Sequence, residues 1–321
     1  MNNLSGEQAA MANRSGTRMF YHLLKAMRPR QWIKNTFVFA ALAFSENRLW
    51  RFWDNPEPML RALGAFICFC LAASAIYLVN DLADIEKDRA HPRKRMRPLA
   101  SGALSPRSAI IATILLIVLA VPLALWVDSD NAGLDFGFLA VLLTYVVVQG
   151  FLYTYWLKNI VILDILIIAA GFVLRAVGGG AVIDVTITPW LLVCMGLLAI
   201  FLGIGKRRHE LTLLEGGAGD HRRILAEYSV PMLDQMLAIV TASIIMAYSM
   251  TTYSAPVAPQ EPYPMLMATI PFVIYAIFRY LYLIYQRGGG GAPEDLVLKD
   301  LPLASSIILW GITVLGVLAI F

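Results

Sequence analysis

Four acidic or amide side chains lie at helical spacing just after an apolar run that ends at Val79. Asp81, Asp84 and Asp88 are three and four residues apart, and Asn80 adds an amide one turn before Asp84. If a helix continues through this stretch, the four groups share one face. Like charges this close repel strongly where water is scarce, so a cation is expected among them. Oxygen ligands of this kind suit Mg²⁺, for which the candidate ligands are Asn80, Asp81, Asp84 and Asp88.

A dense basic run follows these acidic groups directly, and its guanidinium and ammonium groups suit phosphate oxygens. The run consists of Arg89, Arg93, Lys94, Arg95 and Arg97. Carboxylates for a metal beside cations for phosphate are what a site for a diphosphate ester needs. We therefore predict that Arg93, Lys94 and Arg97 bind substrate. The alternative is a solvated helix end with the basic flank that is typical of membrane proteins.

A second basic cluster, Lys206-Arg207-Arg208, closes a later apolar run and is followed by Glu210. Lys206 and Arg207 are candidate phosphate contacts, and Lys206 is also a candidate catalytic residue. Such a cluster could bind a second phosphate of the same substrate or of its partner. A basic flank that only sets the membrane topology would explain the cluster about as well.

Several further charged residues lie in or beside apolar runs, where burial in a membrane is costly and usually has a functional reason. Lys158, Asp164 and Arg175 are predicted to bind substrate, although Lys158 could instead extend to the membrane interface. Asp164 and Arg175 are three helical turns apart, so either could meet a charge on another helix. Lys34, at the start of the first run, could line the site or only set topology. Gly178-Gly179-Gly180 is expected to end a helix.

The composition is that of an integral membrane protein, with 59% hydrophobic and 15% charged residues in a chain of 321. The net charge of +4 is modest and the cations sit in particular loops, so nucleic acid is not an expected partner. The three cysteines all lie in apolar runs, and their positions show no disulfide framework.

Nine apolar runs approach the length of about 20 residues that a membrane-spanning helix needs. These runs are 33–50, 60–80, 108–127, 136–156, 160–178, 189–205, 233–254, 265–285 and 302–320. Basic residues collect in alternate connections, and only Arg48, Arg51 and Arg61 in the first connection depart from this pattern. The pattern places the N-terminus and the chemically interesting loops on the cytoplasmic side. We expect an all-α protein of the cytoplasmic membrane, with a cytoplasmic segment at 1–30 and one transmembrane domain at 31–321. The charged ends of the second and sixth runs suggest two related four-helix halves and a ninth helix.

The acidic motif, in a chain with nine expected spans, resembles that of the UbiA superfamily of intramembrane prenyltransferases. The resemblance implies a helical bundle in which Asn80-Asp81-x-x-Asp84-x-x-x-Asp88 holds magnesium and a diphosphate. Members typically have a second aspartate-rich motif at the end of the sixth helix. This chain instead has Lys206-Arg207-Arg208-His209-Glu210 there, which argues against a second metal clamp for a prenyl diphosphate.

Motifs over most of the chain are similar to those of one branch, the decaprenyl-phosphate phosphoribosyltransferases. These motifs are Arg28–Asn35, Asn80–Gly102, Asp164 with Gly171-Phe172-x-x-Arg175, Lys206-Arg207-x-x-Glu210-Leu211, and Arg279-Tyr-Leu-Tyr282. The branch implies magnesium-dependent transfer of 5-phosphoribose from phosphoribosyl pyrophosphate to a polyprenyl phosphate, for cell-wall polysaccharide synthesis. The catalytic residues carried over are Asp81, Asp84, Asp88 and Lys206.

Two other functions remain open at this point. One is a prenyltransferase that moves a prenyl group from its diphosphate to an aromatic or other acceptor, which the basic cluster at 206–208 disfavours. The other is a transporter in which Asp164 and Arg175 form an ion path. Assembly into a homo-oligomer is compatible with each of these functions.

Overall fold

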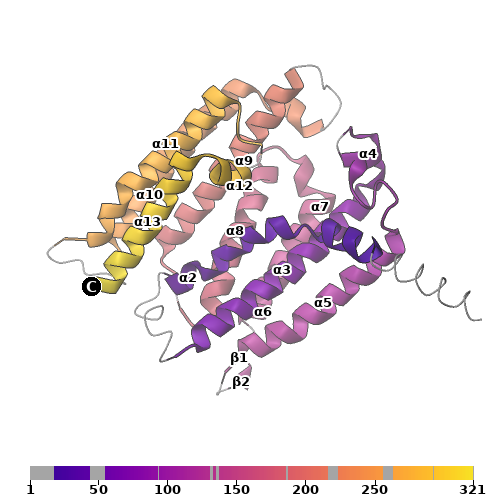
Figure 1. Cartoon of the computed structure of the whole chain (residues 1–321), viewed down its shortest axis with the longest axis horizontal. Coiled ribbons are helices and arrows are strands. Elements are labelled where there is room, and N and C mark those ends of the chain that lie inside the picture. The colour runs from indigo at the N-terminus through magenta and orange to yellow at the C-terminus, as the bar shows by residue number, and fades with distance from the viewer. Residues whose placement is uncertain are drawn as a thin grey trace, which may run out of the picture. The chain divides into compact units, whose positions relative to one another are not determined.

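The computed structural model describes residues 18–43, 55–92, 94–130, 133–134, 137–185, 187–215, 223–255, 263–291 and 293–320. These residues are helical apart from turns, connections and one antiparallel pair of two-residue strands, β1 (Ser129–Asp130) and β2 (Gly133–Leu134) (Figure 1). The expected helical class is therefore confirmed for the described part of the chain, with this small hairpin as an addition.

Helices and helical turns follow one another along the chain. The α-helices are α2 (Ala40–Ala43), α3 (Glu57–Ala83), α4 (Ile85–Ala90), α5 (Pro106–Asp128), α6 (Gly137–Tyr145), α7 (Tyr153–Tyr155), α8 (Leu163–Val182), α9 (Pro189–Glu215), α10 (Val230–Tyr253), α11 (Ile270–Arg287), α12 (Pro293–Lys299) and α13 (Leu301–Ile320). Tighter 3-10 segments cover Pro29–Phe39, Lys94–Met96, Leu157–Asn159, Arg223–Glu227 and Met265–Thr269, and a π-helical segment, Val146–Leu152, joins α6 to α7.

Eight helical segments among the described residues are long and apolar enough to cross a membrane. They are Glu57–Ala83, Pro106–Asp128, Gly137–Tyr155, Leu163–Val182, Pro189–Leu213, Val230–Tyr253, Met265–Arg287 and Leu301–Leu318. Each corresponds to one of the expected runs. The remaining expected run, 33–50, begins as a 3-10 segment and α2, and its residues from 44 onward lie outside the described part. The count of nine therefore stays a prediction.

Two compact units divide the chain. The first unit contains Met1–Thr36 and Leu63–Tyr155, and the second contains Phe37–Ala62 and Trp156–Phe321. The division after Tyr155 coincides with the connection expected between the fourth and fifth spans, where two related halves should separate. The segment Phe37–Ala62 belongs to the second unit, which the proposed halves did not include.

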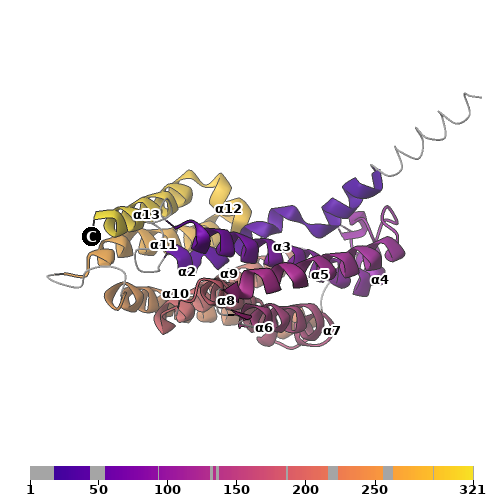
Figure 2. The ribbon, with the colours of Figure 1, turned by 90° about the horizontal axis from the view of Figure 1, so that it is seen from below.

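Small residues let the helices of the first unit approach each other closely. Ala75 and Leu78 of α3 pack in one buried cluster with Ala109 and Ala112 of α5, and the two helices run side by side in Figures 1 and 2. Alanine-rich contacts of this kind are typical of helix packing in membranes, where close van der Waals contact replaces the hydrophobic effect. The packing fixes the C-terminal half of α3, which leads to the acidic motif.

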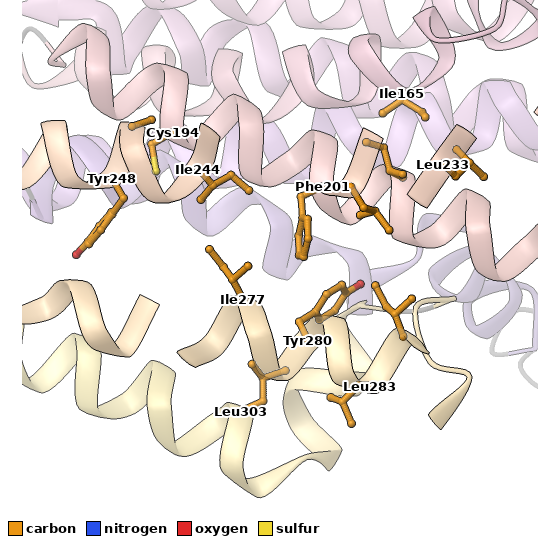
Figure 3. Packing of buried hydrophobic residues seen from close by; sticks show 14 of the residues in the cluster. Ile165, Cys194, Phe201, Leu233, Ile244, Tyr248, Ile277, Tyr280, Leu283 and Leu303 are labelled. Atoms are coloured by element: carbon orange, nitrogen blue, oxygen red, sulfur yellow. The ribbon is translucent and has the colours of Figure 1, made fainter. Parts of the chain in front are cut away.

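The second unit is built around a larger apolar cluster to which α8, α9, α10, α11 and α13 contribute (Figure 3). Phe201 of α9 and Tyr280 of α11 face each other at its centre, with ring centroids 5.3 Å apart. Ile165 of α8 and Leu233 of α10 belong to the same cluster near the end of α9 that carries the basic residues. This core therefore holds the C-terminal half of α9 in place.

The glycine run at 178–180 was wrongly expected to end a helix, because it lies inside α8 (Leu163–Val182). Its function is close packing: a Cβ atom on Gly179 would lie only 1.9 Å from the carbonyl oxygen of Val38. The backbone of the 3-10 segment thus touches the backbone of α8 at a point where no side chain fits. Three consecutive glycines signal either a helix stop or a close approach, and the sequence does not distinguish them.

Replacing Gly179 with alanine should therefore destabilise the protein by about 1–3 kcal/mol, since one of the two backbones must move. Thermal unfolding of the purified protein in detergent measures the change. Gly311→Ala in α13 is the matched control, because a Cβ atom there meets nothing within 4 Å. The control should leave the unfolding temperature unchanged or raise it slightly, and an equal loss in both variants would contradict the assignment.

Candidate active site

The acidic motif lies where α3 passes into α4 with only a small break in the helix. Asp84 sits at the break, with φ −105° and ψ 11°, while its amide still donates to the carbonyl of Asn80. The amide of Asp88 in turn donates to the carbonyl of Asp84. The helical spacing therefore persists through the break. Asp81 and Asp88 lie on one face of the helix, as the sequence predicted.

One guanidinium lies between these two carboxylates. Nη1 of Arg97 donates to Oδ1 of Asp81 at 3.2 Å and to Oδ2 of Asp88 at 2.6 Å. Asp81 and Asp88 are only 2% and 3% exposed, so each needs a compensating charge. The positive charge expected between these carboxylates is thus supplied by Arg97, which belongs to the basic run after the motif.

Arg28 supplies a second cation to Asp81, and sequence reasoning did not identify this pairing. Its Nη2 atom forms an ion pair with Oδ1 of Asp81, and its guanidinium lies over the ring of Tyr77, 4.7 Å from the centroid. Arg28 has a left-handed backbone, φ 56°, between the helical residues 18–27 and the 3-10 segment. Since it lies 53 residues before Asp81, no local spacing could indicate the contact.

The other two groups of the motif make different contacts. Oδ1 of Asn80 accepts a hydrogen bond from the hydroxyl of Thr154 at 2.6 Å. Asp84 is half-buried, and its carboxylate lies 4.0 Å from Nζ of Lys87. The structure therefore gathers two of the four predicted ligands on one cation and leaves the metal-binding role of Asn80 and Asp84 as a prediction.

The donor set fits a divalent cation that is shared with a phosphate ligand. Two carboxylate oxygens converge on a single nitrogen, so both are close enough to reach one small cation at that place. Mg²⁺ usually takes one or two carboxylates and completes its shell with water and substrate phosphates. Among the described residues, no three His, Cys, Asp or Glu side chains gather closely enough to hold a metal by themselves. The geometry thus suits a metal that arrives together with phosphate.

The remaining cations predicted for this unit lie on two segments. Lys94 opens the short 3-10 segment Lys94–Met96, where its amide donates to Nδ1 of His91 at 3.3 Å. Lys34 is half-buried in the 3-10 segment Pro29–Phe39, and Arg93 lies outside the described residues. Their contacts with phosphate stay predictions.

In the second unit, Asp164 meets a charge on another helix, as expected for an ionisable group at membrane depth. Oδ2 of Asp164 accepts from Nε of Arg207 at 2.7 Å, and Nη1 of Arg207 donates to Oε2 of Glu210 at 2.6 Å. Asp164 is completely buried and Arg207 is 3% exposed. Arg175 makes a contact within α8, where its Nη1 donates to the carbonyl of Gly171 at 2.6 Å.

Tyr228 completes this network, and nothing in the sequence pattern singled it out. Its hydroxyl donates to Oδ1 of Asp164 at 2.7 Å and accepts from the amide of Ile162, also at 2.7 Å. Burial and the hydrogen bond to Asp164 raise the pKa of the Tyr228 hydroxyl, so it stays a donor at neutral pH. Ser229 places it by capping α10, with its Oγ accepting from the amide of Met232 at 3.3 Å.

Consecutive residues of the basic cluster on α9 have different surroundings. Lys206 is exposed and Arg207 is buried, while Nε of Arg208 forms an ion pair with Asp234 at 2.6 Å. Lys158 is half-buried in the 3-10 segment Leu157–Asn159, between α7 and α8. Exposure therefore favours Lys206 over Arg207 as a group that could contact a ligand.

Comparison with known proteins matches residues 36–294 to the UbiA prenyltransferase family. Decaprenyl-phosphate phosphoribosyltransferase of Mycolicibacterium smegmatis is 35% identical over 296 residues, which cover 90% of this chain and 89% of that protein. The enzyme of the same name from Corynebacterium glutamicum is 32% identical over 90% of this chain and 84% of that protein. A solved UbiA homolog from Archaeoglobus fulgidus, bound to GPP and Mg²⁺, has a similar fold, with a TM-score of 0.66 at 17% identity over 93% of this chain and 99% of that one.

Replacing Arg97 with alanine should leave Asp81 and Asp88 without their shared cation and cost on the order of 2 kcal/mol of stability. Added Mg²⁺ should then raise the unfolding temperature of Arg97→Ala more than that of the wild type, because the carboxylates become available to it. Arg95→Ala is the control, since Arg95 is an exposed member of the same basic run. Equal effects of Mg²⁺ on the wild type and both variants would count against a cation site here.

Proposed function

Because this chain belongs to the UbiA prenyltransferase family and resembles decaprenyl-phosphate phosphoribosyltransferases along 90% of its length, we propose that it is a polyprenyl-phosphate phosphoribosyltransferase. It transfers 5-phosphoribose from phosphoribosyl pyrophosphate to a polyprenyl phosphate and releases pyrophosphate. The observation that carries the proposal is the pair of buried carboxylates whose oxygens meet on the guanidinium of Arg97. In such a set the carboxylates can bind a metal ion while the guanidiniums bind phosphate oxygens.

Binding of the donor is supported by the way the charges of this site balance. Asp81 and Asp88 carry two negative charges, which Arg28 and Arg97 neutralise. Both guanidiniums can turn to phosphate oxygens when the carboxylates receive another cation, so that no buried charge is left unpaired in either arrangement. Mg²⁺, when bound, neutralises charge on the departing pyrophosphate.

The transfer itself needs orientation more than acid–base catalysis. An oxygen of the polyprenyl phosphate attacks the anomeric carbon of the donor, and the bond from that carbon to pyrophosphate breaks with its electron pair on the leaving oxygen. A phosphate is already anionic at neutral pH, so no general base is needed, and a single displacement inverts the anomeric carbon. Positively charged side chains that hold the reacting phosphates in place supply the orientation.

We assign this orientation to the predicted cations. In the first unit these are Lys34, Arg93, Lys94 and Arg97, and in the second unit Lys158 and Lys206. The exposure of Lys206 supports contact with a ligand. Asp164 and Arg207 are buried against each other, which supports a role in holding the site rather than in touching substrate. Arg175 remains a predicted contact.

The chain is a multi-pass membrane protein, which fits a lipid acceptor. Its apolar spans place a polyprenyl tail and the protein in the same bilayer, whereas phosphoribosyl pyrophosphate is a water-soluble donor. We place the site on the cytoplasmic side, since the acidic motif and both basic clusters lie in connections that the distribution of Lys and Arg assigns to that side.

Membranes that contain the protein should transfer radiolabel from phosphoribosyl pyrophosphate into an extractable lipid when polyprenyl phosphate is added. A chelator should abolish the transfer and excess Mg²⁺ should restore it. Asp88→Asn should lower kcat on the order of 100-fold or more, because one carboxylate of the metal and leaving-group site loses its charge.

Glu86→Gln is the matched control for this experiment, since Glu86 lies on the same short helix with an exposed side chain. It should retain wild-type activity. Wild-type membranes whose label stays in the aqueous phase with or without chelator would refute the proposed reaction. Transfer that survives Asp88→Asn would refute the site.

A further inference from the structure

The connection from α7 to α8 ends in a strained residue. Ile162 has a left-handed backbone, with φ 71°, immediately before α8 begins at Leu163. This region is unfavourable for a β-branched residue and persists only where the surroundings enforce it. The same connection carries Lys158, four residues earlier, in the 3-10 segment Leu157–Asn159. Whatever enforces the conformation of Ile162 therefore also fixes the path of the chain that presents Lys158.

The hydroxyl of Tyr228 is placed to enforce this conformation. It accepts from the amide of Ile162 at 2.7 Å and donates to Asp164 at 2.7 Å, so it connects the strained residue to a buried carboxylate. Asp164 cannot follow a movement of the connection, because Nε of Arg207 binds its other oxygen at 2.7 Å. Arg207 is itself fixed by Glu210 and by burial. The chain of hydrogen bonds thus runs from a buried ion pair to the connection that carries Lys158.

We propose that Tyr228 is a positioning residue, whose hydroxyl holds the backbone of Ile162 and thereby sets the position of the Lys158 ammonium. The inference rests on the proposed function, in which Lys158 contacts a substrate phosphate. Tyr228 does not touch the reacting atoms. Its contribution is to keep Lys158 where it meets the phosphate without further rearrangement, which lowers the cost of ordering the site when substrate binds.

A second tyrosine provides a matched comparison. The hydroxyl of Tyr285 donates to Oδ1 of Asp234 at 2.9 Å, and Asp234 is paired with Arg208 as Asp164 is with Arg207. Tyr285 lies on α11, and its hydroxyl bonds Asp234 of α10 rather than the connection that carries Lys158. Tyr285→Phe therefore removes a tyrosine–aspartate hydrogen bond beside an arginine, in a more exposed place, without removing the acceptor of the Ile162 amide.

Steady-state kinetics with phosphoribosyl pyrophosphate and polyprenyl phosphate test the role in the reaction. Tyr228→Phe keeps the buried ring and should raise KM for one of the two substrates about tenfold, with a much smaller change in kcat. Lys158→Met should raise KM for the same substrate. In the Lys158→Met background, Tyr228→Phe should add nothing further, because the group that it positions is gone. Tyr285→Phe should leave both KM values unchanged.

Multiplicative effects of Tyr228→Phe and Lys158→Met, or an equal effect of Tyr285→Phe, would overturn the proposal. Ile162→Gly gives a further test, since glycine adopts a left-handed backbone without strain. In the Tyr228→Phe background, Ile162→Gly should lower the raised KM most of the way to the wild-type value. A loss of stability alone would not explain such a recovery. Failure of Ile162→Gly to recover any of the loss would likewise count against positioning through the backbone.

Hydrogen exchange at the amide of Ile162 tests the contact without using the reaction. In Tyr228→Phe this amide loses its acceptor and should exchange about five- to tenfold faster, while Tyr285→Phe should not change it. Unchanged exchange in Tyr228→Phe would overturn the positioning role even if the enzyme is active. Faster exchange in a protein that transfers no label would refute the proposed function and, with it, the effect through Lys158, but not the contact.

Discussion

The structure depends on compensating the negative charge of buried carboxylates. In each unit one arginine does this by bridging two acids: Arg97 joins Asp81 to Asp88, and Arg207 joins Asp164 to Glu210. An unpaired carboxylate at such burial costs several kcal/mol, so acids and arginines must be placed together. The ends of the helices that carry them are positioned by this requirement as much as by apolar packing.

The two bridges differ in burial, and this difference separates their functions. The side chain of Arg97 is 30% exposed, so it can exchange its carboxylates for the phosphate oxygens of a ligand that arrives from water. The side chain of Arg207 is only 3% exposed, and removing it from Asp164 would leave a completely buried charge. The first arrangement is therefore suited to binding, whereas the second is suited to holding neighbouring groups still.

Regular patterns in the sequence predicted the helices. The site also depends on contacts between residues that lie far apart in the sequence, which such patterns do not reveal. Hydropathy predicted nine spans, eight of which are found among the described residues, because a helix that crosses a membrane must be long and apolar. Helical spacing placed Asp81 and Asp88 together. The pairing of Arg28 with Asp81 and the contact of Tyr228 with Asp164 were not predicted, because 53 and 64 residues separate the partners and no periodicity connects them. The glycines at 178–180 were misread because the backbone that Gly179 contacts, at Val38, is even more remote in the sequence.

The basic cluster on α9, at residues 206–208, stands where members of the family typically have a second aspartate-rich motif, but the carboxylates near it remain. Arg207 and Arg208 are held by Asp164, Glu210 and Asp234, so the second unit keeps carboxylates at this place and satisfies them with its own guanidiniums. A metal ion there would have to displace Arg207 from a carboxylate that water does not reach. The equivalent displacement in the first unit involves a partly exposed arginine and is much less costly. This asymmetry favours a metal at the end of α3 over a metal at the basic cluster of α9.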